Sequence, residues 1–150
     1  MKGEEVSPEI DPEVNLSVPA FIPGEYIKDV NQRLVVYKRL ASCMQDREVE
    51  EIGEELSDRF GRLPVEVSNL LGVITFKNLL RHYLIASIDC NGREIILTFH
   101  PHARDSLEKI LALIESDPGR FRLSPELKLS VACEKRDWKE VMGEVKKLLQ

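Results

Sequence analysis

Apolar residues recur at helical spacing in three successive segments of the N-terminal half. The first segment, from residue 29, places apolar side chains three and four positions apart, at Val30, Leu34, Tyr37, Ala41 and Met44. We expect this set to form one apolar face of a helix, because residues at this spacing share one side.

A second helix is predicted over residues 46–60, with an apolar stripe at Val49, Ile52, Leu56 and Phe60. Asp46 is the expected N-cap, and Gly61 followed by Pro64 is expected to end the helix. A third helix is predicted from about 64 to 84, with apolar positions at Val67, Leu71, Ile74, Leu80 and Leu84. Short connections predict that the three helices pack as antiparallel neighbours.

The pattern changes in the second half. Asn91-Gly92 between two apolar runs predicts a hairpin that pairs Ile88 with Ile95 and Ala86 with Leu97. Alternation predicts a short strand at 14–18 and another at 127–133, and helical spacing predicts helices near 107–114 and 138–149, the latter capped by Asp137. We therefore predict an α+β fold, with a helical N-terminal half packed with a small, mainly antiparallel sheet and two further helices. Residues 1–13 are predicted to be a disordered lead-in or linker, and 14–150 a single domain.

Composition narrows the class of protein. Asp and Glu number 26 against 21 Lys and Arg, a net charge of −5. Proteins that bind nucleic acid usually carry a positive excess, so a basic protein surface is the more natural partner. Three scattered cysteines, Cys43, Cys90 and Cys133, favour a reducing cytoplasm, and no apolar run approaches the length of a membrane span.

Candidate chemistry is sparse. His100 and His102, with Asp105 nearby, form the only cluster that resembles a metal or acid–base site, but a third ligand at familiar spacing is missing. We interpret them as loop residues and expect no metal. The sequence also lacks a nucleophile elbow, a P-loop and a dinucleotide fingerprint. We expect no cofactor and no catalysis in this chain.

Charge on the second predicted helix is the more informative feature. Glu48, Glu51, Glu55 and Asp58 are spaced three, four and three, so they form one acidic stripe beside the apolar one. Arg59 stands four residues after Glu55, an order that favours an ion pair between them. The stripe suits a docking helix, although charge runs on helices are commonly just solvated faces.

Two strings of this sequence resemble a known family. Residues 20–27 (AFIPGEYI) with 33–41 (RLVVYKRLA), and residues 54–64 (EELSDRFGRLP), are similar to the C-terminal domain of the bacterial transcription-repair coupling factor family, Mfd. The likeness is specific over about 14–84 and looser from there to residue 150. Ser57 occupies a variable position of the family pattern.

The resemblance implies that the chain is part of a larger protein, an ATP-dependent DNA translocase that displaces stalled RNA polymerase and recruits nucleotide excision repair. It implies a non-catalytic, autoinhibitory domain that docks on the UvrB-like module of the same parent chain and masks the surface that recruits UvrA. Glu55, Asp58 and Arg59 match the docking motif, and Glu51 and Glu48 extend the same stripe. UvrA and RNA polymerase would be indirect partners, reached through the parent. The alternative is a nucleic-acid-binding accessory domain.

Overall fold

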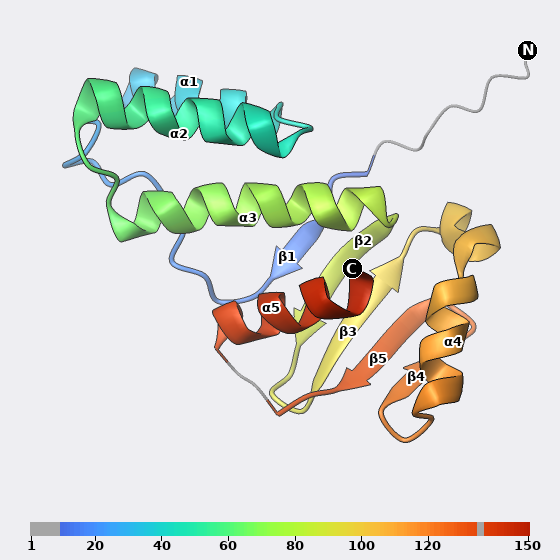
Figure 1. Ribbon diagram of the computed structural model, residues 1–150. Helices are drawn as coiled ribbons and strands as arrows, with labels where there is room; N and C mark the ends of the chain where they lie inside the picture. Colours follow the sequence, from blue (N-terminus) through green and yellow to red (C-terminus); the bar gives the residue numbers. More distant parts are fainter. Residues whose placement is uncertain (1–9, 135–136) are drawn as a thin grey trace, which may run out of the picture. The chain divides into compact units, whose positions relative to one another are not determined.

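The computed structural model describes residues 10–134 and 137–150, and of residues 104–106 only the backbone. The described part forms two compact units, one of residues 17–79 and one of the residues up to Leu16 together with 80–150. Its secondary structure is α+β, as the sequence predicts: helices gather in the first half, and the strands form one five-stranded sheet. Figure 1 shows these elements along the chain.

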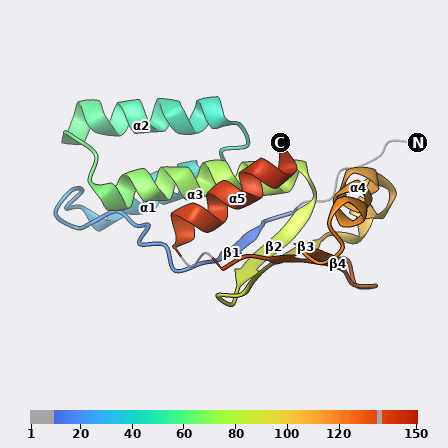
Figure 2. The ribbon, with the colours of Figure 1, turned by 60° about the horizontal axis from the view of Figure 1, so that its bottom comes forward.

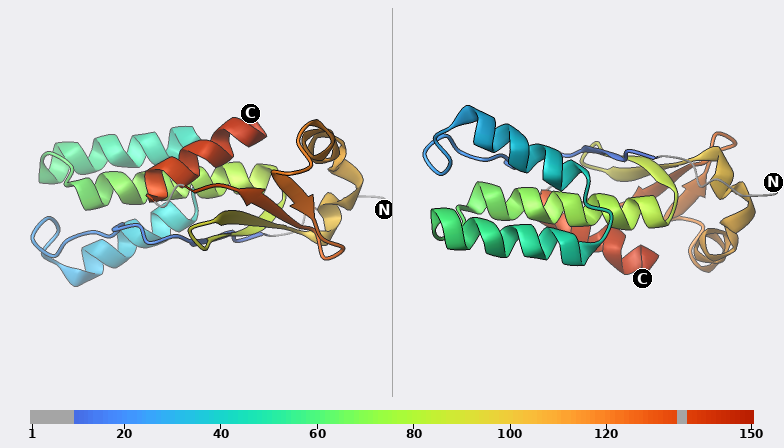
Figure 3. Two further views of the ribbon diagram at one scale, coloured as in Figure 1. Left: turned by 90° about the horizontal axis from the view of Figure 1, so that it is seen from below. Right: turned by 90° about the horizontal axis from the view of Figure 1, so that it is seen from above.

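The helical unit contains α1 (Val30–Ala41), α2 (Asp46–Phe60) and most of α3 (Val65–His82). Figure 3 shows the three helices side by side, each running opposite to the one before it, which agrees with the prediction. Their shared core contains buried residues from all three helices and from the segment before α1, including Ile22, Ile27, Val36, Leu40, Val49, Ile52, Leu56, Val67 and Leu70.

The apolar face predicted for α1 is largely exposed, and of the predicted residues only Tyr37 packs against the core. Val30, Leu34 and Met44 each leave more than half of their surface exposed, while Val36 and Leu40 are almost fully buried. Both sets follow helical spacing, so the pattern alone gave α1 two candidate apolar stripes. Cys43, just beyond the helix, extends the stripe that is actually buried.

The sheet unit has the strand order β1-β2-β3-β5-β4. Its strands are β1 (Glu13–Asn15), β2 (Ile85–Cys90), β3 (Glu94–Phe99), β4 (Phe121–Leu123) and β5 (Lys128–Ala132). All pairings are antiparallel except β1 with β2, which is parallel. Ile10, within the predicted lead-in 1–13, is buried, and its carbonyl accepts a hydrogen bond from Arg81 Nε; residues 1–9 lie outside the described part.

The hairpin forms where it was predicted, but in a different register. Ile88 pairs with Leu97, and Cys90 with Ile95, so the two residues at the tip are Gly92 and Arg93. The cause is Asn91, whose side-chain oxygen accepts the backbone N–H groups of Arg93 and Glu94 and so holds the turn one position later. Ile88 still faces the core, because this shift preserves the parity of the strand.

Two further helices complete the sheet unit, α4 (Glu108–Ser116) and α5 (Trp138–Leu149), together with a short 3-10 helix at Pro101–Ser106. Figure 2 shows α4 and α5 on the same side of the sheet. Val141, Val145 and Leu149 of α5 are buried, and so are the alternating residues Leu129 and Val131 of β5. Asp137 caps α5, as predicted, by accepting a hydrogen bond from the backbone N–H of Lys139.

Candidate functional site: the charged face of helix α2

Local interactions fix both ends of α2. At its start, the Glu48 carboxylate accepts the backbone N–H groups of Met44 and Gln45, both at 3.0 Å. This makes Gln45 the N-cap, one residue before the predicted Asp46, because a glutamate at the third helical position can close back on the cap. At its end, Gly61 adopts a φ of 93°, a value that favours glycine.

Tyr26 holds the C-terminal end of α2 from outside the helix. Its hydroxyl lies 3.0 Å from the carbonyl oxygen of Leu56, near the end of the helix, and 2.7 Å from that of Gly61, the residue that directly follows it. Its ring also packs on Phe60, with the ring centroids 5.8 Å apart. The segment before α1 is therefore tied to the same end of α2 that carries Asp58 and Arg59.

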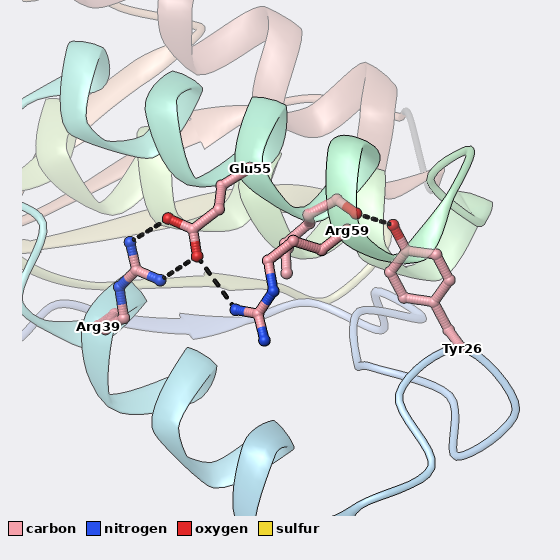
Figure 4. Close-up of polar contacts among 5 residues, drawn as sticks. Tyr26, Arg39, Glu55 and Arg59 are labelled. Atoms are coloured by element: carbon pink, nitrogen blue, oxygen red, sulfur yellow. Dashed lines mark hydrogen bonds and ion pairs between the residues drawn. The ribbon is translucent and has the colours of Figure 1, made fainter.

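Glu55 lies at the centre of an ion-pair cluster between α1 and α2. Its two oxygens accept from both terminal nitrogens of the Arg39 guanidinium, at 2.7 and 2.9 Å, in a bidentate pair. Arg59, the predicted i,i+4 partner, lies 3.4 Å from the same carboxylate. Figure 4 shows Glu55 between the two arginines, with Tyr26 beyond Arg59. The predicted pair is confirmed, and Arg39 is a stronger second partner.

These contacts change the acidity of Glu55. Hydrogen bonds from Arg39, reinforced by the charges of Arg39 and Arg59, lower the pKa of the Glu55 carboxyl from 4.5 to about 2. The carboxylate therefore stays charged throughout the neutral and mildly acidic range. The bridge itself is about one-third exposed, with side-chain exposures of 41% for Arg39 and 36% for Glu55, so salt will weaken it.

The cluster stands between two surface grooves. One groove, of about 580 Å³, is lined on the α1 side by Lys38, Arg39, Ser42 and Cys43 and on the α2 side by Glu48, Glu51, Ile52 and Glu55. The other, of about 190 Å³, is lined by Asn31, Gln32, Val35, Val36, Arg39, Arg59 and Phe60. On one side of the ion-pair cluster, the groove between α1 and α2 contains three carboxylates. On the other side, the groove is lined by apolar side chains, two amides and two arginines.

The five predicted docking residues divide into three groups. Glu48 is bound to the start of its own helix, and Glu55 and Arg59 belong to the cluster. Glu51 and Asp58 are exposed and have no ion-pair or hydrogen-bond partner within the described residues. These two are the carboxylates of the stripe that are free to meet another molecule.

Sequence reasoning missed Arg39 and Tyr26. Arg39 is 16 residues from Glu55, and Tyr26 is 35 residues from Gly61, so no local spacing rule links them. Both lie in strings that carry the family resemblance, which was the only signal available for them.

His100 and His102 lie outside this site. Their rings meet edge to face with centroids 4.9 Å apart, and His100 Nδ1 accepts the backbone N–H of His102 at the start of the 3-10 helix. The Nδ1 atom of His100 is therefore already bound to a backbone N–H group. The side chain of Asp105 is outside the described part. Among the described residues, no group of three or more His, Cys, Asp or Glu side chains is placed to hold a metal ion.

The fold and the site define an α+β domain whose surface presents a charged helix seam suited to protein contacts. No helix in the described part is long and apolar enough to cross a membrane. Residues 16–110 match the TRCF domain family, and the chain belongs to that family.

Similar proteins from several bacteria support the same family assignment. The chain is 32% identical over 151 residues to the transcription-repair-coupling factor of Myxococcus xanthus, covering 100% of this chain and 13% of that protein. It is 33% identical over 138 residues to that of Rickettsia bellii, covering 92% of this chain and 12% of the relative. It is 32% identical over 117 residues to that of Escherichia coli (strain K12), covering 78% of this chain and 10% of the relative. The chain therefore spans only about an eighth of the first two relatives and a tenth of the third.

A solved structure shows the same fold. The crystal structure of a C-terminal domain of transcription-repair coupling factor superposes with a TM-score of 0.75, covering 93% of this chain and 88% of that one. Sequence identity in that alignment is 22%, so this likeness supports the fold alone.

Proposed function

We propose that this chain is the regulatory C-terminal domain of a transcription-repair coupling factor, without catalysis of its own. In this proposal α2 docks on the UvrB-like module of the same parent chain and masks the surface that recruits UvrA. The parent would be a cytoplasmic, ATP-dependent DNA translocase that displaces stalled RNA polymerase and recruits nucleotide excision repair. Release of the domain would follow transcription-linked recruitment.

The observation that carries this proposal is the exposed acidic face of α2. Glu51 and Asp58 project from a helix fixed at both ends, and neither has an internal partner among the described residues. Uncompensated carboxylates on a fixed helix favour a basic partner surface, because they complement its charge without first breaking internal contacts. We assign them to arginines of the UvrB-like module, and Arg59 to an acidic residue there.

Glu55 has a double role in this proposal. It holds α1 to α2 through Arg39, and its carboxylate also pairs with Arg59. A carboxylate has about four lone-pair sites, so it can also accept from a partner arginine. A Glu55→Ala variant would therefore alter both docking and the α1–α2 seam, and Asp58 and Glu51 are the cleaner positions for a test.

The test is calorimetric binding of this chain to the separate UvrB-like module of its parent. We expect the double variant Glu51→Gln, Asp58→Asn to bind at least about tenfold more weakly, since a lost charge pair at a desolvated contact costs about 2–5 kcal/mol. Glu50→Gln removes an exposed carboxylate from another side of α2 and should bind like the unmodified chain.

No binding to the module, or equal loss in the Glu50→Gln control, would contradict the proposal. Salt-sensitive retention of the chain on duplex DNA would instead support the nucleic-acid-binding alternative.

A further inference from the structure

A third groove lies where the chain enters α1 and where α2 turns into α3. Its volume is about 390 Å³, and it is lined by Phe21, Pro23, Glu25, Tyr26, Pro64 and Glu66. These residues come from the two connecting segments and the first turn of α3, and none belongs to the acidic stripe of α2.

Backbone hydrogen bonds hold the walls of this groove in place. Phe21 donates its N–H to the carbonyl of Glu66 at 3.3 Å, which fixes one wall against the other. Tyr26 donates its N–H to the carbonyl of Pro23, and its hydroxyl is bound to the end of α2. The groove is thus formed before any ligand arrives, which lowers the entropic cost of binding.

The chemistry of the lining suits a flat cation. Phe21 is 47% exposed and is the only aromatic among the large exposed hydrophobic residues of the described part. Glu25 is exposed and Glu66 half-buried, and neither has an ion-pair partner within that part. A guanidinium can stack its flat face on an aromatic ring while its edge donates to carboxylates, whereas a lysine ammonium is a compact point charge without a flat face. The same stacking occurs inside this chain, where the Arg59 guanidinium lies 4.9 Å from the Phe60 ring centroid.

We propose that this groove binds an arginine side chain of the partner surface on which α2 docks, with the guanidinium on Phe21 and between Glu25 and Glu66. This inference rests on the proposed function. Tyr26 joins the two sites, because it lines the groove and also binds the end of α2 near Asp58 and Arg59 (Figure 4). The groove therefore continues the acidic surface beyond the last turn of α2 and adds an aromatic anchor to it.

The experiment is the same titration of this chain with the separate UvrB-like module, using two further variants. Phe21→Leu keeps an apolar side chain but removes the aromatic face, and Glu66→Gln keeps the shape but removes one charge. Each should weaken binding about tenfold, in line with an arginine anchor in a pocket. Val65→Ala is the matched control, because Val65 is 61% exposed beside the groove but does not line it.

The outcomes separate the two proposals. If the unmodified chain binds and depends on Asp58, but Phe21→Leu and Glu66→Gln bind as tightly as Val65→Ala, the groove assignment is wrong and the docking of α2 stands. If the unmodified chain does not bind the module at all, both proposals are wrong. Melting temperatures should be unchanged for Phe21→Leu and Glu66→Gln, and a loss of affinity that tracks a loss of folding in both would also overturn the groove assignment.

Discussion

Individual side chains at the α1–α2 seam have more partners than the charge pattern alone would indicate. Spacing on α2 predicts the contact between Glu55 and Arg59, and the structure confirms it. The shorter, bidentate contact comes from Arg39 on the preceding helix. Several residues of α1 are basic, so the sequence alone does not identify which of them meets Glu55. The packing of α1 against α2 brings Arg39 to it.

The Glu55 bridge should make stability depend on pH in a defined window. Its pKa is lowered in the folded chain, so the bridge contributes fully above 4.5 and its contribution is lost as the pH falls toward about 2. We expect the urea midpoint to fall more steeply between pH 4.5 and 2 in the unmodified chain than in Glu55→Gln. The carboxyl resonance of Glu55 should titrate near 2 and move toward 4.5 in Arg39→Gln. Titration of Glu55 near its ordinary value in the unmodified chain would contradict the bridge.

Removal of the Tyr26 hydroxyl should loosen the end of α2. Tyr26→Phe loses the hydrogen bonds to the carbonyls of Leu56 and Gly61 but keeps the ring. We expect the free energy of unfolding to fall by about 1 kcal/mol, as measured by urea denaturation. Tyr83→Phe is the control, because the Tyr83 hydroxyl has no hydrogen-bond partner in the described part and its loss should be near neutral.

At the scale of elements, the sequence predicted the α-helices and most strands of the described part, missed β4, and was less accurate about which helix faces are buried. The bounds of α2 agree with the prediction, and its buried residues Val49, Ile52 and Leu56 belong to the predicted stripe. On α1 two sets of apolar residues follow helical spacing. Packing against α2 and α3 determines which of the two sets is buried. In the hairpin, the dipeptide Asn91-Gly92 indicated a turn correctly, but the side chain of Asn91 moved the turn by one position.

Two leucines on α1 distinguish the predicted face from the observed one. Leu40 is 1% exposed and Leu34 is 53% exposed. Leu40→Ala should therefore lower the free energy of unfolding by about 2–5 kcal/mol, because it opens a cavity in the helical core. Leu34→Ala should change it by less than about 0.5 kcal/mol. Denaturation of the two variants in parallel provides the measurement, and a larger cost at Leu34 would mean that α1 packs by its other face.

At the scale of the whole molecule, local patterns predicted the α+β class but not how distant segments join. The parallel pairing of β1 with β2 brings Asn15 beside Asp89, 74 residues away, where the two side chains share a hydrogen bond. No periodicity encodes such a contact. The acidic stripe shows the same limit, because its spacing on α2 was visible in the sequence. The structure was needed to separate Glu51 and Asp58, which have no partner in the described part, from Glu48 and Glu55, which have internal partners.

We propose that Glu51 and Asp58, the carboxylates of the α2 stripe without an internal partner in the described part, keep the parent protein closed. If the closed form masks the UvrA surface as proposed, the apparent affinity for UvrA is the affinity of the open form multiplied by the fraction of the parent that is open. Weakening the clamp should therefore raise the apparent affinity. The most direct measurement is UvrA binding to the full-length parent with and without Glu51→Gln and Asp58→Asn, with melting temperatures recorded for both proteins. We expect the double variant to bind UvrA more tightly at an unchanged melting temperature. Equal UvrA affinity in a well-folded double variant would contradict it.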